Sequence, residues 1–365
     1  MIAQTFAHRE VLFFCPHVQT FAQFSEQATV PAPNIYLMSV SIKDLAEKAG
    51  VSPSTVSRAL KNHPRIGEDT RQAIQELAQE LGYVPSEAAR ALVGQAAPAI
   101  GVALPDFRDP FYMGMLAGIE EIAIQEQHDL FIGGFNRDPG RERKLFDAFE
   151  EKRLAGIVVA GSLVDDAYLS RARRRLPAVL VNHCEYPAAV AIDQTLGMKQ
   201  AVAHLVGLGH ARIAYVTLGQ RSSSNTLRQR GYEQGLAEAG LPRDEQLIVP
   251  GNGGMDGGEQ AVAQLLALAE MPTAVVCYND RTAIGVIQAL HQRGLQVPED
   301  ISVIGFDDLE IAAFYVPSLT TVRQPDMELG RRAARMLFDQ IQGRNVTAET
   351  LAPELIVRNS TGPNS

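Results

Sequence analysis

The sequence predicts an all-α helix-turn-helix headpiece followed by an α/β core of two doubly wound parallel-sheet lobes. Residues 39–82 carry apolar side chains at helical spacing in three segments that glycines separate. From residue 99 onward, short apolar runs alternate with amphipathic segments, which is typical of parallel strands covered by helices on both faces. The length of this alternation indicates two sheets, with a ligand cleft where their strands end.

The composition is that of an ordinary globular protein, with 365 residues, 46% of them hydrophobic and 21% charged. No apolar run reaches the roughly 18 residues that a membrane helix needs. Three cysteines without a CxxC pair argue against a disulfide framework and a zinc finger. A net charge of −9 argues against coating nucleic acid by bulk charge. We therefore expect a cytoplasmic protein with no metal site, no cofactor and no membrane partner.

Residues 1–37 differ from the rest of the chain, because they carry almost no charge and no clear helical or strand period. The apolar stretch Val11–Cys15 is too short for a signal-peptide core, and no basic cluster precedes it. Two interpretations stay open. One is a disordered extension or a mis-annotated start, with translation from Met38, and the other is an arm for export or partner binding. The missing signal features favour the first.

Residues 38–84 are the predicted headpiece. Gly50 suits the left-handed conformation that often closes a helix. Ser52 is a good N-cap, and Pro53 is a good first residue for the helix that follows. We expect helices at residues 42–49, 53–60 and about 68–81.

The second of these helices has a polar face opposite Val56 and Ala59. That face offers only hydrogen-bond donors, which are Ser54, Thr55, Ser57 and Arg58. Short hydroxyl donors suit phosphate oxygens, and arginine suits a guanine edge. Residues 38–95 carry as many acidic as basic side chains, so charge does not decide between a DNA-binding domain and a capping module with a polar face.

The segment from Ser41 to Leu60 closely resembles the amino-terminal signature of LacI/GalR-type transcription regulators. The resemblance runs from about residue 41 to residue 361, with further matches at 81–85, 204–210, 279–280, 298–308, 317–322 and 358–361. In that family the second helix lies in the major groove of DNA. The resemblance implies base contacts from Pro53, Ser54 and Arg58, and phosphate contacts from Thr55, Ser57 and Asn62.

Residues 85–98 are expected to form the hinge and linker. On their own they could make two helical turns, which are marginal in water, so a plain linker is the alternative. The resemblance implies a hinge helix that folds on operator DNA and pairs with its dimer mate. Leu92 matches a leucine that wedges into the minor groove, an insertion that bends the duplex. Ala89 matches the small residue that lets this helix approach the groove, and Arg90 is expected to reach the backbone of the DNA.

The core is expected to contain strands at residues 100–104, 130–132, 156–159, 178–181, 213–216, 274–277 and 302–306. Amphipathic helices are expected at residues 111–125, 199–208, 232–239 and 281–293. The glycine-rich segment 251–258 is interpreted as a loop between a strand and a helix. The resemblance implies two lobes like those of periplasmic sugar-binding proteins, joined by three crossovers. Lobe 1 would comprise residues 99–195 and about 324–343, and lobe 2 residues 196–323 and about 344–361 with the tail.

The resemblance also maps an effector cleft onto eight residues, namely Asp109, Phe111, Tyr112, Asn182, Thr226, Arg228, Asn279 and Asp307. Their polar and aromatic side chains suit a polyhydroxylated ligand. Two positions depart from the family pattern, because many sugar-responsive relatives have arginine in place of Thr226 and an aromatic in place of Gly253. We expect these changes to open the pocket to a larger ligand or to remove one of the ligand's contacts. His183 could then supply a replacement hydrogen-bond donor to the ligand.

The resemblance thus implies a dimeric repressor of genes for sugar or related carbon-source metabolism, which binds a pseudo-palindromic operator on double-stranded DNA. Its effector would be a sugar, a sugar derivative or a nucleoside-like molecule. A periplasmic-type solute-binding protein is one alternative, but it needs a signal peptide. An α/β enzyme is the other, yet the sequence has no GxGxxG after its first strand, no GxxxxGK[ST], no GxSxG and no HExxH, so we expect no catalytic residues.

Overall fold

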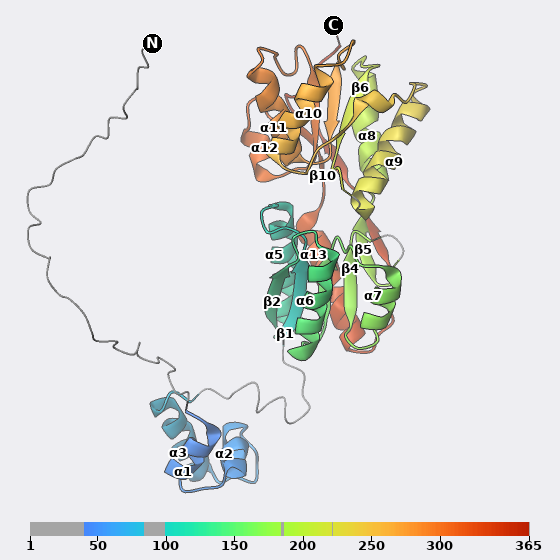
Figure 1. The fold of residues 1–365 in the computed structure, drawn as a ribbon. Coiled ribbons are helices and arrows are strands. Elements are labelled where there is room, and N and C mark those ends of the chain that lie inside the picture. Colours follow the sequence, from blue (N-terminus) through green and yellow to red (C-terminus); the bar gives the residue numbers. More distant parts are fainter. Residues whose placement is uncertain (1–39, 84–98, 184–185, 221, 365) are drawn as a thin grey trace, which may run out of the picture. The chain divides into compact units, whose positions relative to one another are not determined.

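The computed structural model describes residues 40–83, 99–183, 186–220 and 222–364. The chain divides into two units, residues 1–85 and 86–365, and each is described by itself (Figure 1). The expectations for residues 1–37 and for the hinge, including Ala89, Arg90 and Leu92, lie outside the described residues.

The headpiece contains three helices, α1 (Ile42–Lys48), α2 (Pro53–Leu60) and α3 (Glu68–Glu80). Ser41 and Asp44 form a reciprocal capping box at the start of α1, which satisfies two backbone donors that a helix end leaves free. The predicted caps are present, since Gly50 has a φ of +65° and the Ser52 hydroxyl accepts from the Thr55 N–H at 3.2 Å. The core consists of Leu45, Ala46, Val56, Ala59, Ile74 and Ala78.

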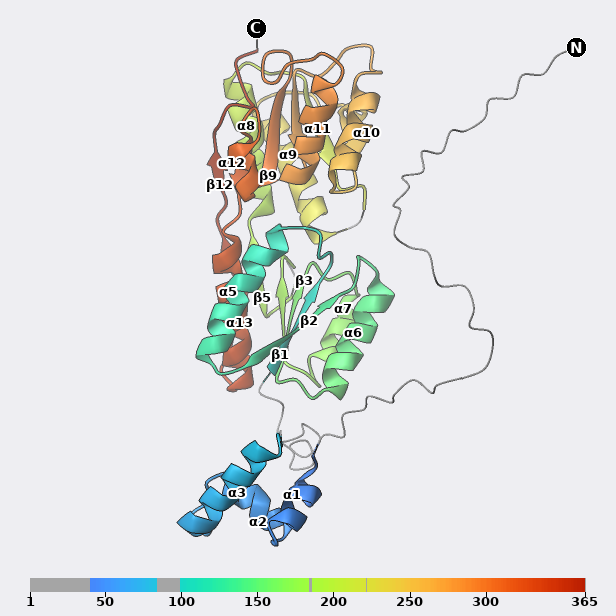
Figure 2. The same cartoon turned by 90° about the vertical axis from the view of Figure 1, so that its left-hand side faces the viewer.

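The first core sheet belongs to lobe 1 and has the order β11-β5-β4-β3-β1-β2, with every pairing parallel. Its strands are β1 (Ala99–Leu104), β2 (Asp129–Gly134), β3 (Ile157–Ala160), β4 (Ala178–Val181), β5 (Ala189–Ile192) and β11 (Glu349–Leu351). Its helices are α5 (Phe111–Gln125), α6 (Pro139–Glu151), α7 (Asp166–Ala172) and α13 (Asp326–Ile341). Figure 2 shows α5 and α13 side by side on one face and α6 with α7 on the other.

The second sheet belongs to lobe 2 and has the order β12-β10-β9-β8-β6-β7, in which only β12 is antiparallel to its neighbour. Its strands are β6 (Ile213–Thr217), β7 (Ile248–Pro250), β8 (Ala274–Cys277), β9 (Ser302–Asp307), β10 (Thr320–Arg323) and β12 (Glu354–Ile356). Its helices are α8 (Gln194–Gly207), α9 (Ser223–Glu238), η1 (Glu245–Leu247), α10 (Met255–Leu265), α11 (Asp280–His291) and α12 (Glu310–Phe314). Apolar clusters fill both faces of this sheet, as the predicted doubly wound fold requires. No helix of the described chain is long and apolar enough to cross a membrane.

Two sequence predictions need correction. The predicted boundary near residue 343 assigns all of residues 344–361 to lobe 2. However, β11, which lies within these residues, pairs with β5 in the sheet of lobe 1. The third crossover therefore lies between Leu351 and Glu354. The predicted loop at 251–258 is also too long, because α10 begins at Met255. A Cβ on Gly258 would lie 2.2 Å from the Thr282 carbonyl oxygen, so this glycine lets α10 pack closely on α11.

Candidate functional site

The predicted DNA contacts of the headpiece lie along α2 and the turn after it. Pro53, Ser54 and Arg58 are exposed, while Thr55 and Ser57 are half-buried. The exposed residue Asn62 follows α2 with a φ of +54°, and its side-chain oxygen accepts from Gln75 Nε2 at 2.9 Å. Four of the six predicted headpiece contacts, Pro53, Ser54, Arg58 and Asn62, are therefore exposed, and DNA contact by all six stays a prediction.

The cleft of the core lies where loops from both lobes meet. The loops after β1 and β3 contribute Pro105 and Gly161 from lobe 1, and those after β6 and β8 contribute Ser222 and Tyr278 from lobe 2. They enclose a cavity of about 20 Å³, which is room for a single water molecule. A ligand the size of a sugar does not fit this cavity in the lobe arrangement seen here.

Arg228 and Asp307 form the buried centre of this region. Their exposed fractions are 3% and 7%, and Arg228 Nη2 lies 3.7 Å from Asp307 Oδ1. The guanidinium also donates to the Tyr278 carbonyl and stacks on two rings, with 3.8 Å to the centroid of Phe306 and 4.4 Å to that of Tyr278. Burial raises the pKa of the Asp307 carboxyl well above its usual range, and the charge of Arg228 opposes that rise.

Two glutamines that sequence reasoning missed connect this pair to the crossovers. Gln194 stands after β5 and accepts from Arg228 Nε at 2.7 Å, and Gln324 stands after β10 and donates to Asp307 Oδ1 at 2.6 Å. Gln194 Nε2 donates to Gln324 Oε1 at 3.1 Å. One hydrogen-bonded network therefore connects residues at the first two crossovers with the buried pair of lobe 2.

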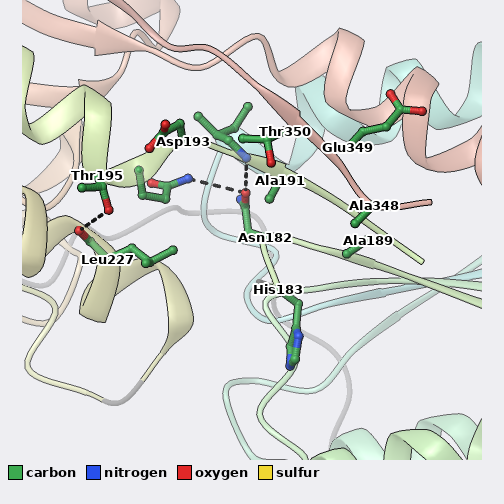
Figure 3. A pocket seen from close by; sticks show the side chains of 12 residues that line it. Asn182, His183, Ala189, Ala191, Asp193, Thr195, Leu227, Ala348, Glu349 and Thr350 are labelled. Atoms are coloured by element: carbon green, nitrogen blue, oxygen red, sulfur yellow. Dashed lines mark hydrogen bonds between the residues drawn. The ribbon is translucent and has the colours of Figure 1, made fainter. Parts of the chain in front are cut away.

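Asn182 joins this network from lobe 1. Its Oδ1 accepts from the Ile192 N–H at 3.0 Å and lies 3.5 Å from Gln194 Nε2 (Figure 3). Asn182 lines a second cavity of about 260 Å³ beside the first crossover. His183 lines the same cavity, with its ring directed away from Asn182 and its Nε2 3.7 Å from an Asp166 oxygen, and its role as a replacement donor stays a prediction (Figure 3).

The three predicted residues of the first loop have different surroundings. Asp109 is 5% exposed, and its Oδ1 accepts from the Phe111 N–H at 3.3 Å. Burial raises the pKa of the Asp109 carboxyl, and the charges of Arg281, Arg137 and Arg228 counteract that rise. Tyr112 lines the small cavity, whereas Phe111 packs into the core of lobe 1.

The remaining two predicted residues serve local hydrogen bonds. Asn279 caps α11 by accepting from the Thr282 N–H at 2.9 Å, and its Nδ2 donates to the Gly253 carbonyl at 3.0 Å. Thr226 is exposed, and its hydroxyl donates to the Ser222 carbonyl at 3.1 Å within α9. Of the eight predicted effector contacts, Tyr112 lines the small cavity and Asn182 lines the larger one. The other six line neither of these two cavities, and effector contact by all eight stays a prediction. In the described part of the chain, no three His, Cys, Asp or Glu side chains are grouped to hold a metal ion.

Comparisons with known proteins agree with this architecture. The model of the bacterial regulatory proteins of the lacI family matches residues 41–86, and that of the periplasmic binding protein-like domain matches residues 202–361. The transcriptional regulator GalR of Escherichia coli (strain K12) is 34% identical over 331 residues, which cover 89% of this chain and 96% of GalR. The transcriptional repressor CytR of the same strain is 36% identical over 328 residues, which cover 88% of this chain and 96% of CytR.

A solved structure extends the comparison to three dimensions. The lac repressor dimer bound to operator and the anti-inducer ONPF matches with a TM-score of 0.79 and 28% sequence identity, covering 89% of this chain and 99% of that one. The predicted fold class is thereby confirmed, and the relatives named here are regulators rather than enzymes or solute-binding proteins. The chain belongs to the lacI family of bacterial regulatory proteins and is a DNA-binding transcription regulator.

Proposed function

We propose that this chain, acting in the cytoplasm, binds a pseudo-palindromic operator as a homodimer and represses genes for sugar or related carbon-source metabolism. A small molecule bound between the lobes would change that binding. The observation that carries the proposal is the combination of two features in one chain. One is α2 with its hydrogen-bond donors, and the other is a two-lobe core with the buried ion pair of Arg228 and Asp307. The likeness to the operator-bound lac repressor dimer and to the repressor CytR supports it.

In this proposal α2 enters the major groove. Pro53, Ser54 and Arg58 read bases, and Thr55, Ser57 and Asn62 hold phosphates. Proline offers no hydrogen bond, so its base contact is apolar, for example with a thymine methyl group. Ala89, Arg90 and Leu92 approach the minor groove at the centre of the site.

The effector is a sugar, a sugar derivative or a nucleoside-like molecule, and we place it between the lobes. The proposed contacts are Asp109, Phe111, Tyr112, Asn182, Thr226, Arg228, Asn279 and Asp307. The nearly closed cavity supports a mechanism in which ligand binding selects one lobe arrangement. A ligand that favours the operator-binding arrangement acts as a co-repressor, and one that favours another arrangement acts as an inducer.

The proposal is tested first at Arg58, because this exposed side chain is the strongest candidate for direct base reading. Arg58→Ala is expected to weaken binding to the selected operator by about 1–3 kcal/mol and to relax the preference at one base position. The measurement is selection of binding sites from random DNA, followed by titration of the best site and of an unrelated duplex at one salt concentration. An equal loss of affinity on both duplexes would contradict base reading by Arg58.

The proposed dimer is tested by a substitution on α12 of lobe 2. Ile311, Phe314 and Val316 are 48%, 74% and 80% exposed, and such a cluster of exposed apolar side chains marks an interaction surface. Phe314→Asp is expected to shift the protein to monomers in sedimentation velocity, because the partner surface would bury an unpaired charge. Met271→Asp is the control, since this exposed side chain precedes β8, at the opposite end of the sheet. An unchanged dimer in Phe314→Asp would remove α12 from the interface.

A further inference from the structure

We infer that a basic patch on lobe 1 binds phosphate groups of the operator DNA, in addition to the contacts of the headpiece and the hinge. The patch consists of six exposed cationic residues, namely Lys152, Arg153, Arg171, Arg173, Arg174 and Arg175. The inference rests on the proposed function and adds a contact between the core and DNA that does not depend on base sequence. The sequence analysis did not select these residues.

The patch lies at one edge of the sheet of lobe 1. Lys152 and Arg153 stand in the turn between α6 and β3, and residues 173–175 stand in the turn between α7 and β4, which pairs with β3. The Ala155 N–H donates to the carbonyl of Ala99, the first residue of β1, at 2.8 Å. The patch therefore adjoins the point at which the chain enters the core from the hinge, at the edge away from the cleft loops.

The patch has an excess of positive charge. Residues 150–153 and 171–175 contain six cations and only two carboxylates, those of Glu150 and Glu151. Arg175 pairs with Glu150 at 3.4 Å, whereas Arg171 and Arg174 form no ion pair within the part of the chain that the structure describes. Five of the six cations are arginines, whose planar fork of N–H donors matches the oxygens of a phosphate group.

This positive charge is local. At the same edge of the sheet, the turn between α5 and β2 carries Glu126 and Asp129, and the whole chain has a net charge of −9. Residues 38–95 carry as many acidic as basic side chains, so the headpiece and the hinge contribute no net attraction to DNA. The patch is a concentration of cations that can contribute such attraction.

The covalent link between the patch and the hinge is short. The proposed function places Leu92 at the minor groove, and the seven residue steps from Leu92 to Ala99 span at most about 25 Å. Because β4 is two strands away from β1, its start lies only about 10 Å further along the edge. The patch is thus tethered to within a few tens of Å of Leu92, and DNA presents one phosphate charge per about 1.7 Å of its axis. An acidic protein surface also attracts cations, but this tether to a DNA-binding headpiece favours DNA as the partner.

The test is the salt dependence of DNA binding by the full chain and by its double variant Arg171→Gln/Arg174→Gln. Two duplexes of equal length are used. One carries the site selected from random DNA and extends beyond it on both sides, and the other is an unrelated sequence. Each lost phosphate contact makes the slope of log K against log salt concentration less steep by about 0.9.

We therefore expect the slope of the double variant to be less steep by at least about 1, with at least about tenfold weaker binding near 0.1 M salt. The ratio of affinities for the two duplexes should stay the same, because phosphate contacts carry no sequence information.

Two matched variants serve as controls. Arg171→Lys/Arg174→Lys keeps both charges and is expected to retain the wild-type slope. Arg230→Gln/Arg293→Gln removes two exposed cations from lobe 2, which is the same change in net charge, and is expected to bind DNA like the wild type. Thermal unfolding is measured for each variant, and the single variant Arg174→Gln is used if the double variant does not fold.

Three results would overturn the inference. They are a wild-type slope in Arg171→Gln/Arg174→Gln, weaker binding at an unchanged slope, and an equal loss in the lobe 2 control, which would make net charge rather than the patch responsible. Each of them leaves the proposed function intact if the selected site is still bound. A wild-type protein that selects no DNA site would refute the proposed function itself, and the inference with it.

Discussion

Arg228→Ala is expected to abolish the response to effector and to lower the free energy of unfolding of the core by about 3–5 kcal/mol. The substitution leaves the carboxyl of Asp307, which is 7% exposed, without its cation. It also removes the stacking on Phe306 and Tyr278 and the hydrogen bond to Gln194. The measurement is urea unfolding of the full chain, with effector-dependent operator binding measured alongside.

Two control variants separate the contribution of the Arg228 charge to stability from the contribution of its packing. Arg228→Met keeps the apolar stem and removes the charge, and combining it with Asp307→Asn removes the unpaired carboxylate as well. We expect the double variant to be more stable than Arg228→Ala, because replacing both partners of a buried ion pair costs less than removing one. It should still fail to respond to effector. Wild-type stability of Arg228→Ala would show that the pair does not stabilise the closed core.

Helices and strands were predictable from the sequence where the local pattern of apolar residues and the packing of the folded chain favour the same element. The expected helix at 111–125 is α5, and each of the seven expected strands is present, because short apolar runs leave a clear pattern. Six of these strands are buried along their whole length, whereas β2 is partly exposed. Five strands were not predicted, namely β5, β7, β10, β11 and β12. Of these, β11 and β12 each have three residues and are not fully buried. The hydrogen-bond partners of β11 and β12 lie in different sheets, and no local pattern specifies which sheet such a short edge strand joins.

The candidate site was only partly predictable. The pattern of α2 and its cap is local, so the positions of Ser54 and Arg58 follow from the sequence. Gln194 and Gln324 were missed because glutamine is usually a surface residue, and only the folded crossovers bring these two together over 130 residues.

Leu45→Ala is expected to unfold the headpiece at physiological temperature and to remove operator binding while effector binding remains. Leu45 is fully buried among the six core residues of the headpiece. Such a truncation costs about 2–5 kcal/mol, and a domain this small rarely has more than about 3–5 kcal/mol to lose. The measurement is calorimetric unfolding, in which the headpiece and the core are followed as separate transitions, together with titration of operator DNA.

The control for this variant is Gln79→Ala, because Gln79 is exposed on α3 and its truncation creates no cavity. It should bind operator like the wild type. The core transition of Leu45→Ala should occur at the wild-type temperature, since the core clusters of the two lobes contain no headpiece residue. If the core transition also shifted downward, the two units would depend on each other for stability, and the effector would then act on the folding of the headpiece as well as on its binding to DNA.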